Sequence, residues 1–216
     1  MSERLRIALT KGRLQDSSVE LFEDMGIDCS PIRNPGRRLI HECPNYPLDA
    51  MLCKAPDVIT YVAHGVCDLG IVGKDTLMEH VENAGRYYEV LDLGFGKCRF
   101  ALAVKKGTDF YGTYKLRRIA SKYPEVTRSF FAEKGMDVEI IKIEGSVELA
   151  PLVDLADAIV DIVETGSTLK ANGLVAIETV APVTARLIVN PASMKLHKQN
   201  MVDFISKVEE ELRRRV

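Results

Sequence analysis

Short β-type runs alternate with helical patterns along nearly the whole chain, and this alternation limits the fold more than any other feature of the sequence. The run "RIALT" (residues 6–10) is typical of a buried strand, and a helical pattern follows the turn "KGR" and stops at Gly26. Further strands are predicted at residues 49–55, 67–73, 98–104, 117–122, 138–143 and 157–163. Because strands that alternate with helices usually pair in parallel, the pattern predicts an α/β fold with mostly parallel sheets.

The alternation restarts near the glycines of "LGFGKCRF" (residues 93–100), which suggests a crossover into a second lobe. Two strand-like runs within residues 173–191, followed by an amphipathic helix, would bring the chain back to the first lobe. We therefore predict a discontinuous first lobe, residues 1–95 plus 178–216, and a second lobe, residues 96–177, of the type II periplasmic-binding-protein kind. A central cleft is expected between them, because ligands of open α/β sheets bind outside the carboxyl ends of the strands.

Composition excludes several classes of protein. A chain of 216 residues with 46% hydrophobic content can bury a sizeable core, and a formal net charge of −2 gives no reason to expect nucleic-acid or membrane binding. The five cysteines show no C-x-x-C spacing, which argues against a disulfide framework and a zinc site and favours a reducing cytoplasm. The N-terminal apolar run is too short for a signal peptide or a membrane anchor.

The segment "DIVETGSTL" carries the strongest functional signal. It places Asp161 and Glu164 at the end of a predicted strand, directly before a run of small and hydroxyl-bearing residues. Backbone N–H groups and hydroxyls at the start of a helix favour a phosphate, and the carboxylates suit sugar hydroxyls or magnesium, so a ribose 5-phosphate satisfies both halves. The residues predicted to hold the phosphate are Thr165, Gly166, Ser167 and Thr168, and Leu169 is assigned to the same site. The alternative is a capped strand-to-helix turn that binds no ligand.

Three segments together resemble a known family: "ELAPLVDLADAIVDIVETGSTLKANGL", "IALTKGRL" and "CDLGIVGKD". In this order and at this spacing they resemble ATP phosphoribosyltransferase, the first enzyme of histidine biosynthesis, over nearly the whole chain. One departure is Asp154, where the family pattern usually has glycine, and this affects only the turn before the strand. The chain resembles the short form of the family, which lacks an additional C-terminal regulatory domain.

The resemblance implies an enzyme that transfers the 5-phosphoribosyl group from phosphoribosyl pyrophosphate to N1 of ATP and releases pyrophosphate. Adenine N1 is a neutral lone-pair nucleophile, so the barrier lies mainly in separating charge as the ribose carbon becomes oxocarbenium-like. The resemblance also implies Mg²⁺, a separate regulatory subunit related to histidyl-tRNA synthetase, and a homodimer within a hetero-oligomer. Weak or no activity is expected from the chain alone.

Basic residues at the ends of two predicted elements are candidates for the triphosphate and the leaving group. Lys11, Gly12 and Arg13 directly follow the first strand and are assigned to ATP binding, and "NPGRRLI" supplies Arg37. Because a guanidinium can fork onto phosphate oxygens, Arg13 and Arg37 are the predicted catalytic residues. For an isolated arginine the alternative is a solvated surface charge.

The segment "DLGIVGKD" supports two readings equally. Asp68 and Gly70 are assigned to ATP binding, since a glycine lets the backbone approach a nucleotide and a carboxylate can accept from an amine or hydroxyl. Equally, Gly73 could permit only a tight turn, and Asp75 could cap the following helix. Cys98, beside the predicted lobe junction, is assigned to the adenine pocket without a reactive role. No P-loop or dinucleotide fingerprint is present.

Two alternative functions fit the same fold. A non-catalytic two-lobed protein could bind a small anion or phosphometabolite, and a different phosphoribosyltransferase could use the same loop with another acceptor. A binder would show affinity for a phosphorylated metabolite without releasing pyrophosphate. The acidic pair next to the phosphate loop is not needed for anion binding alone.

Overall fold

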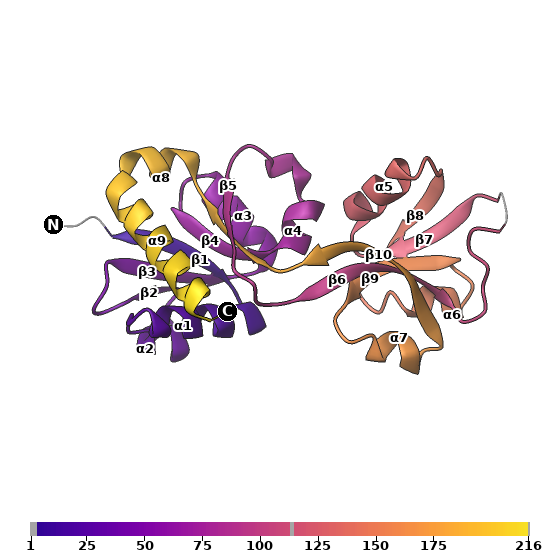
Figure 1. Ribbon diagram of the computed structural model, residues 1–216, viewed down its shortest axis with the longest axis horizontal. Coiled ribbons are helices and arrows are strands. Elements are labelled where there is room, and N and C mark those ends of the chain that lie inside the picture. Colours follow the sequence, from indigo (N-terminus) through magenta and orange to yellow (C-terminus); the bar gives the residue numbers. More distant parts are fainter. Residues whose placement is uncertain (1–3, 113–114, 216) are drawn as a thin grey trace. The chain divides into compact units, whose positions relative to one another are not determined.

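A computed structural model describes residues 4–112 and 115–215 of the chain (Figure 1). The chain divides into two compact units, a first unit of Met1–Gly96 with Thr184–Val216 and a second unit of Lys97–Val183. The return to the first unit thus comes at Thr184, later than the predicted residue 178. The reason is that residues 174–183 form one long strand. It pairs with the strand of residues 98–105 up to its last residue, Val183, which lies opposite Cys98.

The first unit contains a mixed sheet in the order β2-β3-β1-β4-β11-β5. Its strands are β1 (Leu5–Thr10), β2 (Ile40–Glu42), β3 (Leu48–Cys53), β4 (Leu69–Gly73), β5 (Tyr88–Asp92) and β11 (Ala185–Val189). Its helices are α1 (Arg13–Asp24), α2 (Ser30–Arg33), α3 (Ala55–Ala63), α4 (Lys74–Glu79), the 3-10 helix η1 (Val81–Asn83), α8 (Pro191–Leu196) and α9 (Lys198–Arg214).

The second unit contains a mixed sheet in the order β10-β6-β9-β7-β8. Its strands are β6 (Cys98–Lys105), β7 (Arg117–Ser121), β8 (Val138–Lys142), β9 (Ala158–Val163) and β10 (Leu174–Val183). Its helices are α5 (Pro124–Glu133), α6 (Leu149–Leu152) and α7 (Ser167–Ala171).

The predicted α/β class is confirmed, but the sheets are mixed rather than mostly parallel. Strands β3, β1 and β4 run parallel, as do β8, β7 and β9, because helical crossovers join them. Strands β11 and β5 in the first sheet, and β6 and β10 in the second, pair antiparallel. The chain passes from the first unit to the second between β5 and β6, and it returns between β10 and β11.

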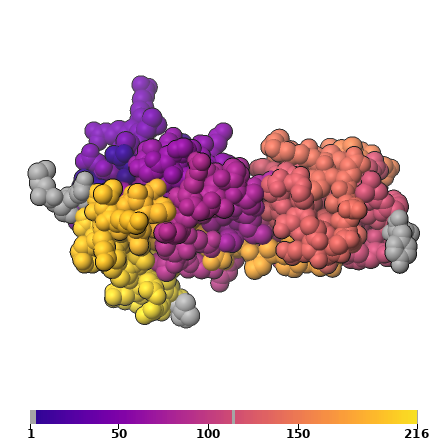
Figure 2. Space-filling view, turned by 90° about the horizontal axis from the view of Figure 1, so that it is seen from above, coloured from indigo at the N-terminus to yellow at the C-terminus, as the bar shows by residue number. Residues whose placement is uncertain are grey.

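Helices cover both faces of the first sheet, which explains why β1 contains the buried apolar run "IAL" at residues 7–9. On one face, Phe22 of α1 meets Phe204 of α9 edge to face, with ring centroids 5.8 Å apart. On the other face, Val58 and Val62 of α3 pack against the sheet. The apolar stripe of α9 therefore belongs to the core, while its other side forms part of the surface (Figure 2).

The second unit has a separate core in which small residues of the sheet, such as Ala101, Ala103 and Ala120, pack with Ile159 and Leu169. No helix formed by residues 4–112 or 115–215 is long and apolar enough to span a membrane.

Candidate functional site

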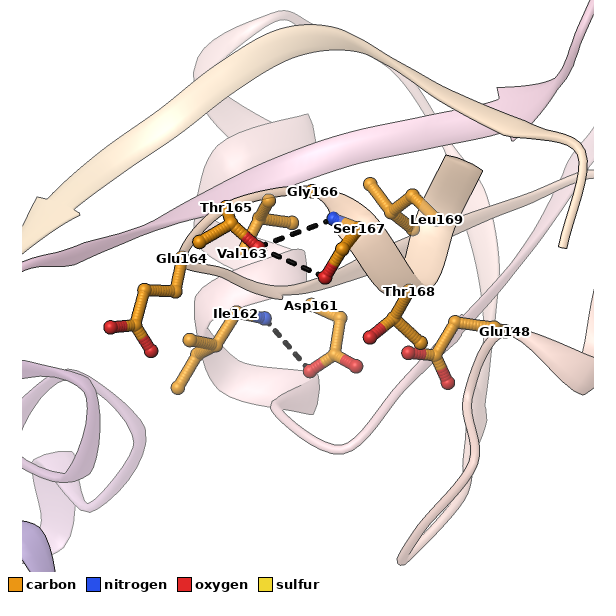
Figure 3. A pocket seen from close by; sticks show the side chains of 10 residues that line it. All are labelled: Glu148, Asp161, Ile162, Val163, Glu164, Thr165, Gly166, Ser167, Thr168 and Leu169. Carbon is orange, nitrogen blue, oxygen red and sulfur yellow. Dashed lines mark hydrogen bonds between the residues drawn. The ribbon is translucent and has the colours of Figure 1, made fainter. Parts of the chain in front are cut away.

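A pocket of about 290 Å³ opens at the carboxyl end of β9 in the second unit (Figure 3). We call it the β9 pocket. Its lining residues are Glu148, Asp161, Ile162, Val163, Glu164, Thr165, Gly166, Ser167, Thr168 and Leu169. The structure therefore brings together all seven residues that the sequence assigned to phosphoribosyl pyrophosphate.

Asp161 lies in β9 and is partly buried. Burial raises the pKa of its carboxyl group above the ordinary value, and the negative charge of Glu148 adds to this shift. The Ile162 N–H, which donates to Asp161 Oδ1 at 2.8 Å, and the charge of Lys122 act in the opposite direction. The protein thus holds a carboxylate where charge is costly, which is typical of a group that meets a polar ligand.

Glu148 was missed by the sequence analysis. It precedes α6, and a turn at Ser146, which has a positive φ of 48°, brings the chain there. Figure 3 shows the Glu148 carboxyl group on the same side of the loop as Asp161 and the Thr168 hydroxyl, whereas Glu164 points away from them. Glu148 opens the segment "ELAPLVDLADAIVDIVETGSTLKANGL" that carries the family resemblance, but it was given no role because its place beside Asp161 depends on tertiary structure.

Gly166 allows the chain to turn from β9 into α7. Its φ of 76° and ψ of 6° are left-handed, a conformation that favours glycine. The Thr165 hydroxyl lies 3.0 Å from the Ser167 hydroxyl and accepts from the Ser167 N–H at 3.3 Å. Leu169 is buried and fixes the start of α7 to the core, so that the exposed hydroxyls and N–H groups of the turn face the pocket.

A second pocket, of about 340 Å³, lies within the first unit, and we call it the basic pocket. It is lined by Lys11, Pro35, Gly36, Arg37, Arg38, Leu39, His41 and Leu52. No described aspartate or glutamate lines it, and its charged side chains, Lys11, Arg37 and Arg38, are all positive. Lys11 is fixed there because its N–H donates to the Cys53 carbonyl of β3 at 2.9 Å. The structure thus places Lys11 with Arg37, two predicted residues that lie far apart in the sequence.

Two neighbours of Lys11 do not line the basic pocket. Gly12, with a φ of 91°, forms the turn between β1 and α1, and Arg13 begins α1 with an exposed side chain. The basic pocket instead contains Arg38 and His41, which the sequence analysis did not assign. The one feature of the sequence that could have pointed to them is their position after the Pro35-Gly36 turn.

Asp68 and Gly70 both take part in the packing of the first sheet. The Arg6 N–H donates to Asp68 Oδ2 at 2.7 Å, at the amino end of β1 and therefore at the opposite edge from Lys11. A Cβ atom at Gly70 would lie 2.7 Å from Val58 Cγ1 of α3, so only glycine lets this helix pack. The alternative reading concerned a turn at Gly73 and a helix cap at Asp75, and it did not foresee these packing roles of Asp68 and Gly70.

Cys98 is the first residue of β6 and is partly buried. Arg99 pairs with Val163, so Cys98 lies one position further, beside the strand end that leads to Glu164. It does not line the β9 pocket.

Asp154, the departure from the family pattern, has a positive φ of 56°. This left-handed conformation explains why glycine suits the position, and aspartate is among the residues that tolerate it best. Its carboxylate pairs with Lys105 at 2.7 Å, and the hydrogen bond from Lys105, together with its charge, holds the pKa of Asp154 below its ordinary value. Asp154 precedes β9, whereas the loop of the β9 pocket follows the carboxyl end of that strand.

Comparisons with known proteins agree with one another. The family model described as ATP phosphoribosyltransferase matches residues 54–210. ATP phosphoribosyltransferase of Clostridium kluyveri is 57% identical over 206 residues, which cover 95% of this chain and 93% of that protein. The protein of the same name from Clostridium acetobutylicum is 56% identical over 207 residues, which cover 96% and 95%.

Among solved structures, the ATP phosphoribosyl transferase (HisG:HisZ) complex from Thermotoga maritima matches with a TM-score of 0.82 and 32% identity. This match covers 97% of this chain and 99% of that chain. The periplasmic aliphatic sulphonate binding protein SsuA from Escherichia coli, at 11% identity, shares the fold with a TM-score of 0.60 over 98% of this chain and 73% of its own. The predicted two-lobed fold class is thereby confirmed, and the chain belongs to the ATP phosphoribosyltransferase family.

Proposed function

We propose that the chain transfers the 5-phosphoribosyl group from phosphoribosyl pyrophosphate to N1 of ATP, the first step of histidine biosynthesis. The observation that carries this proposal is the β9 pocket, where hydroxyl and N–H donors adjoin carboxylates at the end of one strand. A sugar phosphate needs both kinds of group, and a simple anion needs only the donors.

In this proposal, the 5-phosphate binds the turn of residues 165–169. The ribose hydroxyls donate to Asp161, with Glu148 and Glu164 on either side of it. Hydroxyl donors would add to the hydrogen bond that the partly buried Asp161 accepts from the Ile162 N–H, which supports Asp161 as the main ribose contact. A carboxylate there also stabilises the positive charge that develops on the ribose ring.

The basic pocket is assigned to the phosphates of ATP or to the departing pyrophosphate. Lys11 provides a point charge and Arg37 a fork that matches phosphate oxygens, with Arg38 adding to the field. Arg13, next to Gly12, is assigned to the same polyanion from the start of α1. No strong general base is required beforehand, because N1 attacks with a neutral lone pair.

Mg²⁺ fits this arrangement as a substrate-bound ion. Among residues 4–112 and 115–215 no group of three or more His, Cys, Asp or Glu side chains forms a metal site, whereas Mg²⁺ commonly needs only one or two carboxylates besides phosphates and water. Asp161 and Glu148 are the residues that would hold it. When bound, the ion neutralises charge on the diphosphate.

A regulatory partner is also proposed. The matching Thermotoga maritima structure is a HisG:HisZ complex, and the chain covers 99% of the matched chain. We assign this protein to the same arrangement, as a homodimer within a hetero-oligomer that contains a separate synthetase-like subunit.

The test is pyrophosphate release from ATP and phosphoribosyl pyrophosphate with Mg²⁺, measured with and without the synthetase-like subunit. Release that depends on both substrates, and that rises with the second subunit, supports the proposal. Binding of phosphoribosyl pyrophosphate without any release indicates a binding protein. Release with another base but not with ATP indicates a different acceptor.

A further inference from the structure

Lys122, a cation that the proposed reaction does not use, lies beside the β9 pocket. It is the first residue after β7, the parallel neighbour of β9, and its side chain is exposed. Ser121 pairs with Val160 in these two strands, so one position further along, Lys122 lies beside Asp161 at the carboxyl edge of the sheet. The lysine is therefore next to a residue that lines the pocket.

We propose that Lys122 binds the diphosphate of phosphoribosyl pyrophosphate in the β9 pocket and stabilises it as the leaving group. This inference rests on the proposed function, and it gives the leaving group a cation within the second unit. The basic pocket of the first unit is then left for the phosphates of ATP.

The alternation of side chains along β7 gives Lys122 its direction. Ala120, two residues earlier, packs in the core that includes Leu169 of α7. Asp161 likewise comes two residues after Ile159 of the same core. Because side chains two residues apart in an extended chain share a face, Lys122 and Asp161 both project from the face that α7 covers. The β9 pocket opens on this face.

The residues on either side of Lys122 are fixed by contacts of their own. The buried Ser121 hydroxyl donates to the Val160 carbonyl at 2.6 Å and accepts from the Tyr123 N–H at 2.9 Å. The Tyr123 ring meets Phe100 edge to face, with ring centroids 4.8 Å apart. The backbone that carries Lys122 is therefore held firmly, and only the lysine side chain is left to adapt to a ligand.

The β9 pocket has no cation among its lining residues. Of the ten that the structure describes there, Glu148, Asp161 and Glu164 are acidic and none is lysine or arginine. Burial raises the pKa of Asp161, and the charge of Lys122 partly opposes this shift, so the ammonium group acts on that carboxylate. Within residues 4–112 and 115–215, no aspartate or glutamate holds Lys122 in an ion pair, which leaves its ammonium group for a ligand.

The position of Lys122 favours the diphosphate over the 5-phosphate. In the proposed complex the 5-phosphate binds the turn of residues 165–169, which leads into α7, and α7 packs against β10. Strands β10 and β7 lie on opposite sides of β9, so the turn and Lys122 flank Asp161 from opposite sides. The diphosphate is attached to C1, beside the 2-hydroxyl, while the 5-phosphate is at the other end of the sugar. With the ribose hydroxyls on Asp161, Lys122 therefore meets the diphosphate.

The chemistry asks for a positive charge at this end of the sugar. The lone pair of adenine N1 forms a bond to C1 while the bond from C1 to the diphosphate oxygen breaks, and the electron pair of that bond leaves with pyrophosphate. The Lys122 ammonium group donates hydrogen bonds to the diphosphate oxygens as their negative charge grows, and it gives up no proton. A compact ammonium on a flexible stem suits this role.

The experiment measures binding of two ligands to the full-length protein without ATP, so that no transfer occurs. Calorimetry with Mg²⁺ compares phosphoribosyl pyrophosphate with ribose 5-phosphate, which lacks the diphosphate. The matched control for Lys122→Gln is Lys115→Gln, since Lys115 precedes β7 and pairs with Asp157 at 2.8 Å at the opposite edge of the sheet. Both variants lose one positive charge from an end of the same strand.

We expect Lys122→Gln to bind phosphoribosyl pyrophosphate roughly tenfold more weakly than the wild type, with unchanged affinity for ribose 5-phosphate. Lys115→Gln should match the wild type for both ligands. Lys122→Arg, which keeps the charge, should bind phosphoribosyl pyrophosphate within about threefold of the wild type. Thermal unfolding should give the same melting temperature for Lys122→Gln, Lys122→Arg and the wild type, because the side chain is exposed.

Equal weakening of both ligands in Lys122→Gln would place the lysine at the 5-phosphate and overturn the inference. Unchanged affinity for phosphoribosyl pyrophosphate, or an equal loss in Lys122→Arg or in the control, would overturn it as well. In these cases the wild type still binds phosphoribosyl pyrophosphate and the proposed function stands. A wild type that binds neither ligand overturns the proposed function, and this inference with it.

Discussion

The two units are built on one plan, and their differences lie in the loops. The strand order β3-β1-β4-β11-β5 of the first unit corresponds to β8-β7-β9-β6-β10 of the second. In both orders the first three strands pair in parallel, and the last two pairs are antiparallel. In the first unit, Lys11 and the arginines of the basic pocket lie between β1 and β2. In the second unit the hydroxyls and carboxylates follow β9, the counterpart of β4. One scaffold therefore presents opposite charges from different strand ends.

The correspondence extends to single hydrogen bonds. Asp68 accepts from the Arg6 N–H at 2.7 Å, and Asp157 accepts from the Arg118 N–H at 2.9 Å, each at the amino end of its sheet. The hydroxyls at the ends of β1 and β7 each donate to a carbonyl of the neighbouring strand. Groups that recur in both units hold the scaffold, and groups that occur in one unit are candidates for function.

The strongest test of this distinction is Asp161→Asn, since Asp161 has no acidic counterpart in the first unit, where Val72 and Gly73 end β4. We expect turnover to fall by about 10²- to 10³-fold, because the amide cannot stabilise the positive ribose ring. The measurement is the rate of pyrophosphate release at saturating substrates.

The same variant should be more stable than the wild type at neutral pH. The native pKa of Asp161 is raised, so its ionised form costs stability above that pKa, and the cost disappears as the pH falls through it. Thermal unfolding at neutral and acidic pH measures this difference. A variant that is less stable at neutral pH would show a structural role for the carboxylate.

The next largest effect is on KM, and it tests whether each pocket binds a different substrate. Arg37→Ala should raise the KM for ATP roughly tenfold, and Thr168→Val should do the same for phosphoribosyl pyrophosphate, because each removes uniform binding to one ligand. Steady-state kinetics with each substrate varied in turn provides the measurement. If both variants change the same KM, the division of ligands between the units is wrong.

Asp68→Ala and Asp157→Ala should behave as a pair. Each removes the acceptor of a strand N–H and should cost about 1–2 kcal/mol of unfolding free energy, with little change in KM. Denaturant unfolding of both variants is the measurement, with Asp203→Ala on the exposed side of α9 as a control. A raised KM for ATP in Asp68→Ala alone would return that residue to the nucleotide site.

The smallest effect concerns Asp154. Asp154→Gly should be neutral or slightly stabilising, because glycine relieves the left-handed backbone while the exposed pair with Lys105 contributes little. Asp154→Ala should lower the melting temperature more than Asp154→Gly does. Lys105→Gln isolates the ion pair, and a larger loss there than in Asp154→Ala would contradict the backbone explanation.

Much of the fold and of the β9 pocket could be predicted from short stretches of the sequence. The apolar runs of β1 and β9 marked buried strands, and the hydroxyl-rich turn with Gly166 marked the β9 pocket, because each depends on neighbouring residues only. Glu148 could not be predicted in the same way, since it meets Asp161 through tertiary structure. Asp68 and Gly70 were ambiguous for the same reason: a carboxylate or a glycine beside a strand looks alike whether it meets a ligand, an N–H or a helix.

The discontinuous first unit also bears on the order of synthesis. The second unit is one continuous stretch, so the ribosome delivers all of its strands together, and it can fold before translation ends. The first unit, begun earlier, must wait for β11 and α9. Until then Phe22 lacks the ring of Phe204, and the nascent chain carries an unfinished apolar surface through most of its elongation.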